Sequence, residues 1–555
     1  MHSQRISPRV CLLIGIVFAL VAYLPICFMD FGIHNDYFIW SYNHRKGVFP
    51  ETHHLLMIGR PLGALLLNLH FYFIKTIGGL AVSRFVACAC GFVCAWLLAS
   101  YLNKRLQVAW FAAMVASVCV FTLPSMQLFV VWATNAVPGC LTVLLAILSY
   151  LLLDHTDARA LLQRPRTRIV FNLVASEMLF LGALLIYPPS SLFVLVFTAA
   201  NILYSPLAAW PATRARVIRD VVVFGMGMFV YFVSTKWLLL PALSAWDPRC
   251  REVLERLTAN TEYSFEASFD PAIYLERFAR ISRIAVGGVF DFVAGDQAAI
   301  VVAVATGVMI LVAILGRLIR HGKHSQDPAT GQLPRASWRI QALVSGAVVI
   351  FMMNAPNLLA AGGGFTCYRV LFALSATMVL FLLNCVNRAI GVAPAMMRAR
   401  LAIVAGMLLA VSSTLIAHRN MVSTAAEANG ELTFVRQSLR DVDFSKVRKI
   451  VVRRASPGNN WHDHTLRGEF AQMATNNCFI WGIVDVVLRE LKVDRSRLVI
   501  SGVGFDAHEL TVDGCRLIAS GVGEDCQAMP FASIASGSVC EIHWPRARQL
   551  PPSSQ

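Results

Sequence analysis

Charged residues are scarce in this chain. They make up 14% of its 555 residues, and 57% are hydrophobic, whereas soluble globular proteins carry about 25% charged residues. The chain also lacks a P-loop and a dinucleotide-binding glycine fingerprint, which argues against an ATP-driven pump and a soluble nucleotide-sugar enzyme. It has no basic patch interleaved with aromatic residues, so nucleic acid is not an expected partner. The low charge content, together with the long apolar runs described next, excludes a soluble globular protein.

Long apolar runs are what the chain has instead. Their length of about 17–25 residues suits a hydrocarbon core about 30 Å thick, and only helices satisfy the backbone of such runs. We predict a polytopic α-helical membrane protein with about eleven transmembrane helices. The expected spans are residues 10–29, 79–102, 108–124, 127–153, 169–187, 190–209, 220–241, 297–316, 339–358, 367–387 and 399–417. The first run lacks a small-residue cleavage site and is interpreted as a retained anchor.

The basic residues predict an orientation. Most of the net charge of +16 lies in alternate connections, and cytoplasmic loops carry an excess of Lys and Arg. These connections hold Arg5, Arg9, Lys104, Arg105, Arg159, Arg164, Arg166, Arg168, Arg214, Arg216, Arg219, Arg317, Arg320, Lys323, Arg335, Arg388, Arg398 and Arg400. The opposite short connections, 124–127 and 188–190, carry no charge. We therefore expect a cytoplasmic N-terminus and a C-terminus outside.

Two loops and the tail are expected on the outer side. Residues 1–417 form the predicted membrane domain, with outer loops 30–78 and 242–296 and an interfacial helix near 55–75. The tail, 418–555, has a soluble composition and the pattern of a small α/β domain. We expect its helices at 425–440 and 470–491 and its strands at 449–453, 497–501 and 539–543. Its four cysteines allow three connectivities, of which Cys515–Cys526 is the first to test.

The densest polar cluster follows the first span. It includes Asp36, His53, His54 and Arg60, together with several aromatic residues. A carboxylate there is able to act as a general base on a hydroxyl, aromatic rings stack on sugars, and Arg or Lys holds phosphate. A solvated loop rich in interfacial Trp and Tyr would have the same composition. His53 and His54 are neighbours on a helix and point different ways, so we do not expect them to share a metal.

Three motifs, two of them in this region, resemble a known family. The sequence HNDY at 34–37, followed by GRPL at 59–62 and by CYRVLFALS at 367–375, resembles the O-antigen glucosyltransferase II (Gtr-type) family of class C (GT-C) membrane glycosyltransferases. The resemblance covers most of the chain, including the tail. Relatives often carry an acidic pair after the first span, whereas here Asp36 stands between Asn35 and Tyr37. This departure leaves the role of a second carboxylate, for which Glu51 is the fallback, and of a metal open.

The resemblance implies an activity and a location. A hexose, usually glucose in this family, passes from a polyprenyl-phosphate donor to a lipid-linked or lipopolysaccharide glycan. The reaction takes place on the periplasmic face of a bacterial inner membrane. Asp36 is the expected base of an inverting reaction, and Arg60 and Arg369 are the expected ligands of the donor phosphate. No metal or other cofactor is required, because a lipid phosphate is already a good leaving group. Further contacts to sugar or acceptor are assigned to Asn35, Tyr37, Trp40, Glu51, His53 and His54.

Two other functions fit a polytopic chain. A transporter or lipid-linked-sugar flippase would place polar residues at the membrane midplane, where Glu177 is nearly alone. We expect that carboxyl to be neutral and hydrogen-bonded between helices, although it would also suit a polar pathway. The glycine run 362–364 would fit either a cavity wall or a simple loop. A scaffold that binds a partner through its tail is the third possibility.

Overall fold

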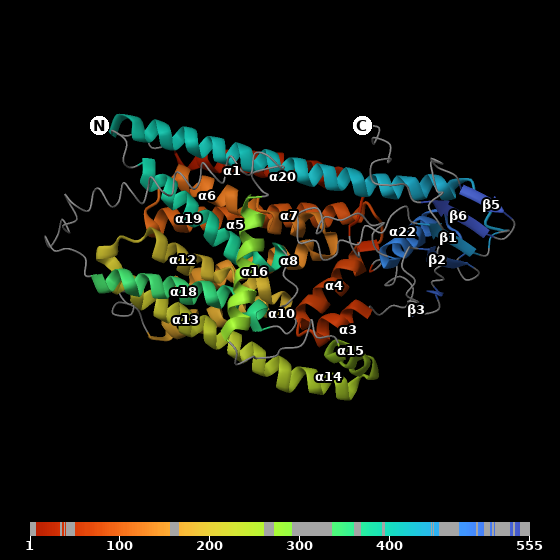
Figure 1. The fold of residues 1–555 in the computed structure, drawn as a ribbon, viewed down its shortest axis with the longest axis horizontal. Helices are drawn as coiled ribbons and strands as arrows, with labels where there is room; N and C mark the ends of the chain where they lie inside the picture. The colour runs from red at the N-terminus through yellow and green to blue at the C-terminus, as the bar shows by residue number, and fades with distance from the viewer. Residues whose placement is uncertain are drawn as a thin grey trace.

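The computed structural model places most of the helical part of the chain. It describes residues 7–33, 36, 37, 39, 50–155, 166–259, 271–290, 336–359, 368–390, 395–445, 447, 449–453, 477–494, 498–503, 511, 512, 515, 516, 533–536 and 539–543. Helices run side by side through the larger part of the molecule, and a small sheet lies at one end (Figure 1).

Within the described residues, eight helical stretches are long and apolar enough to cross a membrane, or up to nine if a bent pair is one span. They are built from α1 (Pro8–Tyr23), α5 (Gly79–Leu106), α8 (Ala133–Asp154), α10 (Arg166–Ile186), α13 (Trp210–Val233) continuing into α14 (Leu240–Trp246), α18 (Ala336–Leu359), α19 (Phe372–Ile390) and α20 (Ala395–Arg440). Each of the eight coincides with a predicted span, and the chain is treated below as a multi-pass membrane protein. The predicted span 297–316 lies outside the described residues.

Two predicted spans differ in form. Residues 108–131 form α6 (Trp110–Phe121) and α7 (Pro124–Val131), which meet at a bend of 59°. All eight residues of α7 are buried, so it lies inside the protein. Likewise α11 (Pro188–Ser191) and α12 (Val194–Tyr204) give an apolar stretch shorter than a full span. Proline occupies the first turn of α7 and α11, where its missing N–H costs no helical hydrogen bond.

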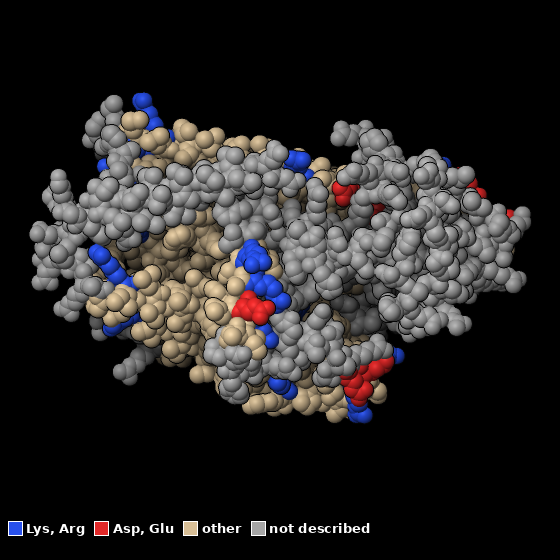
Figure 2. Space-filling view, viewed as in Figure 1, with Lys and Arg blue, Asp and Glu red and all other residues tan. Residues whose placement is uncertain are grey.

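The outer loops contain short helices. The expected interfacial helix is divided into α3 (Pro50–Met57) and α4 (Pro61–Phe73). The break falls at Gly59, whose φ of +80° favours glycine. The second loop contains α15 (Pro248–Ala259) and α16 (Pro271–Phe290). The charged side chains visible in Figure 2 lie mainly over α15, over α16 and at the end far from the sheet, and much of the other described surface is uncharged.

The tail is joined to the membrane domain by one continuous helix. The expected break between a last span and helix 425–440 is absent, because α20 runs through both for 46 residues. Beyond it are β1 (Lys449–Arg453), α22 (Asn477–Glu490), β2 (Val499–Val503), β3 (Thr511–Val512), β4 (Cys515–Arg516), β5 (Ser533–Ser536) and β6 (Val539–His543). The order β2-β1-β6-β5 is parallel except at β5, which is antiparallel to β6. The pairing Cys515–Cys526 involves side chains outside the described residues and stays a prediction, as does the division into two domains.

A shared apolar core joins the tail to the first outer loop. Tyr37 and Phe71, each 1% exposed, cluster with Leu432 and Leu439 of α20 and Val487 of α22. Burying a large apolar side chain contributes about 1.5–3 kcal/mol. The tail therefore stabilises the chain segment that carries Asp36.

Candidate functional site

The side chain of the predicted base, Asp36, contacts the N-terminus of α8. Its Oδ2 accepts hydrogen bonds from the backbone N–H groups of Ile33 (3.0 Å) and Ala133 (3.1 Å), and Oδ1 accepts one from Thr134 (2.8 Å). Ala133 and Thr134 are the first residues of α8, whose N–H groups have no partner within the helix. The carboxylate therefore caps a helix 97 residues away in sequence, at the end that favours negative charge.

The carboxyl of Asp36 is fully buried, at 0% exposure. Burial raises its pKa, while the hydrogen bonds from Ile33 and Thr134 and the charge of Arg84 act in the opposite direction. A base with a raised pKa takes a proton more readily near neutral pH. Three backbone N–H groups donate to this carboxylate, and the Thr134 side chain also acts to lower its pKa.

Arg84 fixes the backbone that leads to Asp36. Its guanidinium donates to the carbonyl oxygen of Met29 (3.1 Å) and to that of Phe31, and it lies 3.5 Å from the centroid of the Phe31 ring. Arg84 is 0% exposed within α5. Arg84 was not among the predicted site residues, although a charged residue inside an apolar run is itself a signal of a structural or functional site.

Tyr37, predicted to contact sugar, is held in the same turn. Its hydroxyl accepts the N–H of Gly32 at 2.8 Å. A Cβ on Gly32 would lie 3.0 Å from the Cβ of Asp36, so the turn packs closely on itself. Burial raises the pKa of Tyr37, which keeps its hydroxyl protonated. The ring lies in the core shared with the tail, and its contact with sugar stays a prediction.

The predicted phosphate ligand Arg60 lies between α3 and α4. The turn before it is fixed by Tyr231, whose hydroxyl donates to the carbonyl oxygen of Gly59 at 3.0 Å. The guanidinium of Arg60 lies 4.5 Å from the centroid of the Tyr187 ring. Its Nε is buried and has no hydrogen-bond partner among the described residues. Arg60 also precedes Pro61 at the N-terminus of α4, an end of the helix that favours anions.

The second predicted phosphate ligand, Arg369, stacks on Trp132. The guanidinium lies 4.4 Å from the ring centroid, and Trp132 is the residue between α7 and α8. Phe129 of α7 lies 5.9 Å from Tyr187 between ring centroids. Three contacts therefore lie around the break between α7 and α8. Asp36 bonds to the first residues of α8, and Arg369 stacks on Trp132. Phe129 contacts Tyr187, the ring on which Arg60 stacks. Trp132 and Tyr187 were not among the predicted site residues either, because their spacing in the sequence carries no signal of this contact.

The remaining predicted contacts are only partly described. His53 lies in α3 with Nε2 3.1 Å from Oδ2 of Asp247 in the second outer loop. The hydrogen bond from Arg249 N–H and the contact with His53 lower the pKa of Asp247. His54 is half-buried on the same helix. The side chain of Glu51, together with Asn35 and Trp40, lies outside the described residues, so these assignments stay predictions.

Comparison with known proteins gives matches among solved structures alone. No family model and no curated protein matches the chain. It is similar to the apo oligosaccharyltransferase of Archaeoglobus fulgidus at 11% identity and a TM-score of 0.41, over 88% of this chain and 69% of that chain. The oligosaccharyltransferase AglB of the same organism, with an inhibitory peptide and a dolichol-phosphate, is similar at 12% identity and a TM-score of 0.38 over 88% and 68%. Likeness of this degree assigns no family, so the site is interpreted from the chain's own side chains.

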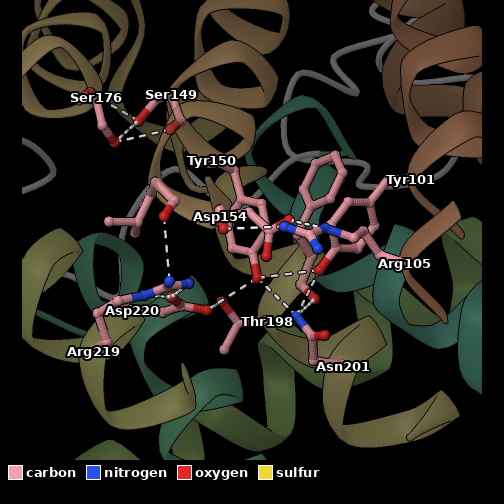
Figure 3. Close-up of polar contacts among 12 residues, drawn as sticks. Tyr101, Arg105, Ser149, Tyr150, Asp154, Ser176, Thr198, Asn201, Arg219 and Asp220 are labelled. Atoms are coloured by element: carbon pink, nitrogen blue, oxygen red, sulfur yellow. Dashed lines mark hydrogen bonds and ion pairs between the residues drawn. The ribbon is translucent and has the colours of Figure 1, made fainter. Parts of the chain in front are cut away.

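A second buried polar cluster lies at the opposite end of α8. Figure 3 shows its members, which include Tyr101, Tyr150, Thr198, Asn201, Arg219 and Asp220. Oδ2 of Asp220 accepts the hydroxyls of Tyr150 (3.1 Å) and Thr198 (3.0 Å). Oδ1 accepts two N–H groups of Arg219 at 2.7 and 3.0 Å, and Nδ2 of Asn201 donates to Tyr150 at 2.7 Å. This network ties α8, α12 and α13 together at the end that the basic loops predict to be cytoplasmic.

Glu177 lies on α10 against α13. A Cβ added at Gly227 of α13 would lie 2.7 Å from its Oε2, so the carboxyl is packed at a helix contact. This position fits the expectation of a carboxyl held between helices. Its expected hydrogen bond stays a prediction.

Proposed function

We propose that this protein is a membrane glycosyltransferase of the GT-C type. It would transfer a hexose from a polyprenyl-phosphate donor to a hydroxyl of a surface glycan. The observation that supports the proposal is that the buried carboxylate of Asp36 bonds to the start of α8 while Arg369 stacks on Trp132 at the break between α7 and α8. Arg60 stacks on Tyr187, a ring that Phe129 of α7 contacts. The resemblance at HNDY, GRPL and CYRVLFALS supports glucose as the sugar and an O-antigen or related lipopolysaccharide glycan as the acceptor. Such a reaction belongs on the periplasmic face of a bacterial inner membrane, with the N-terminus cytoplasmic.

The proposed chemistry assigns a role to each end of the site. The acceptor oxygen attacks the anomeric carbon and gives its proton to Asp36, while the bond from that carbon to the phosphate oxygen breaks. The charge that returns to the lipid phosphate is stabilised by Arg60 and Arg369, whose fork-shaped guanidinium groups match phosphate oxygens. Attack opposite the leaving group inverts the anomeric configuration. Because Asp36 is fully buried, acceptor binding has to open a path to its carboxyl group.

Transport of the lipid-linked sugar is the alternative, and the cluster around Asp220 bears on it. A transport path through the bundle has to open at both ends in turn. The polar atoms of Asp220 are occupied by four hydrogen bonds among α8, α12 and α13. A buried, hydrogen-bonded charge pair is costly to break, by about 3–5 kcal/mol when one partner is removed. This arrangement favours a glycosyltransferase at the outer membrane surface over a transporter, with the donor brought to that surface by another protein.

The arginine assignment is tested with the purified full-length protein and a labelled polyprenyl-phosphate glucose donor. A hydrogen bond to a charged group contributes about 1.5–3 kcal/mol, so Arg60→Ala is expected to raise the donor KM by about 10–100-fold. Arg60→Lys should restore part of this loss. The matched control is Arg214→Ala, an exposed arginine whose guanidinium lies 3.4 Å from Gln341. Equal donor KM values for Arg60→Ala and the control would contradict the assignment. Movement of the donor across liposomes without transfer to glycan would favour the transporter.

A further inference from the structure

Three potential metal ligands meet between the two outer loops. They are His53 of α3, Asp247 immediately before α15, and Cys250 of α15. The ligand atoms of the three side chains all lie within 4.8 Å of one another. His53 and Asp247 are 194 residues apart in sequence. We propose that His53, Asp247 and Cys250 bind a zinc ion that links the first outer loop to the second.

The local structure holds the three ligand side chains close together. Oδ1 of Asp247 accepts the N–H of Arg249 at 2.9 Å, which fixes the carboxylate at the start of α15. Its other oxygen faces Nε2 of His53 at 3.1 Å. Asp247 has an extended backbone and directly precedes α15, of which Cys250 is the third residue. Each ligand is therefore held by an element that is already folded.

The chemistry of the three ligands indicates the metal. One imidazole nitrogen, one carboxylate oxygen and one sulfur match the mixed donor sets of Zn²⁺, whereas Mg²⁺ and Ca²⁺ prefer oxygen alone. Zinc binds nitrogen and oxygen at about 2.0–2.2 Å and sulfur at about 2.3 Å. In a tetrahedron of that size neighbouring ligands are about 3.3–3.8 Å apart, close to the separation of His53 and Asp247. The fourth position is left for water or another ligand.

Burial and charge are also compatible with a metal. Cys250 is 1% exposed and His53 is 8% exposed. Binding to zinc would release the thiol proton of Cys250 to solvent. The charges of the ion, one carboxylate and one thiolate would then cancel. The Asp247 side chain is 37% exposed, which leaves a route for the ion from solvent.

The site would have a structural consequence for the donor pocket. It would fix α3 against α15, and α3 leads through the turn at Gly59 into Arg60. The expectation that His53 and His54 do not share a metal is compatible with this site, since His54 is not among the three ligands. A simple hydrogen bond between His53 and Asp247, with Cys250 packed beside it, is the competing explanation.

Metal content of the full-length purified protein separates these two explanations. After growth with zinc and dialysis, the wild type is expected to hold one zinc equivalent more than His53→Ala, Asp247→Asn or Cys250→Ser. His54→Ala, on the same helix, should match the wild type. Equal zinc in the wild type and in Cys250→Ser would overturn the proposal, because a hydrogen bond alone does not need the sulfur.

A spectroscopic measurement covers variants that fail to fold. Wild-type protein stripped of metal and loaded with Co²⁺ should show a thiolate-to-cobalt charge-transfer band. Cobalt-loaded protein without this band would contradict the site.

Discussion

Replacing Asp36 by Asn tests both roles of this carboxyl at once. The substitution keeps the shape but puts an NH₂ group where one acceptor oxygen stood. If the amide oxygen takes the place of Oδ2, the bonds from Ile33 and Ala133 remain and the N–H of Thr134 loses its acceptor. A charge-assisted hydrogen bond contributes about 1.5–3 kcal/mol, and the charge at a helix N-terminus about 0.3–1 kcal/mol. We expect a loss of about 2–4 kcal/mol in the free energy of unfolding.

The rate of hexose transfer by Asp36→Asn should fall much further than its loss of stability explains. Removal of a general base typically lowers the rate by about 10²–10⁴-fold. The assay is the initial rate of hexose transfer by purified protein, measured at a temperature where thermal unfolding shows the variant folded. Donor KM should change little, because the phosphate is held by other residues.

Asp220→Asn is the matched control for Asp36→Asn. It also removes a fully buried carboxylate, at the other end of α8, and should lower the melting temperature by at least as much while kcat stays within a few-fold of the wild type. If the two variants lose activity in the same proportion, Asp36 acts through folding and is not the base. Full activity of folded Asp36→Asn would refute the assignment outright.

Three further substitutions test the surroundings of the site. Gly59→Ala forces a side chain into a φ of +80° and places a Cβ 2.8 Å from Thr235 Cγ2; it should destabilise by about 1–3 kcal/mol and raise the donor KM, as thermal unfolding and kinetics will show. Tyr187→Leu removes the ring beneath Arg60, a contact of about 0.5–2 kcal/mol, and should raise the donor KM by about 2–30-fold; an unchanged KM would contradict the stacking role. Leu439 is fully buried between the tail and the first loop, so Leu439→Ala should lower the free energy of unfolding by about 2–5 kcal/mol. It should also lower the rate of hexose transfer by the folded variant; an unchanged rate would show that the tail does not support the site.

Hydropathy located the full-length spans, because a helix in lipid needs an uninterrupted apolar run. The same signal could not separate α7 or α11–α12 from true spans. A short helix buried in protein is as apolar as one in contact with lipid, and the proline at position 124 marks a helix start in either case. The continuous α20 was also missed, since its polar second half reads as a separate helix.

The site was predictable in its residue types and not in its contacts. The position of Asp36 after the first span indicated a polar site, yet its bonds to Ala133 and Thr134 join segments 97 and 98 residues apart. The stacking of Arg60 on Tyr187 and of Arg369 on Trp132 likewise depends on the fold. Arg84 differs from these residues, because a charge within an apolar run is visible in the sequence and could have been singled out. Asp247 was not singled out, since a lone aspartate in a polar loop is common.

We propose that this protein adds a hexose to a surface glycan from a polyprenyl-phosphate donor. Mass spectrometry of the surface polysaccharide compares cells with the gene, cells without it, and cells with the Asp36→Asn form restored at wild-type abundance. Each repeat unit should lose one hexose mass without the gene, and Asp36→Asn should fail to restore it. Identical polysaccharide masses in all three strains would refute the proposal.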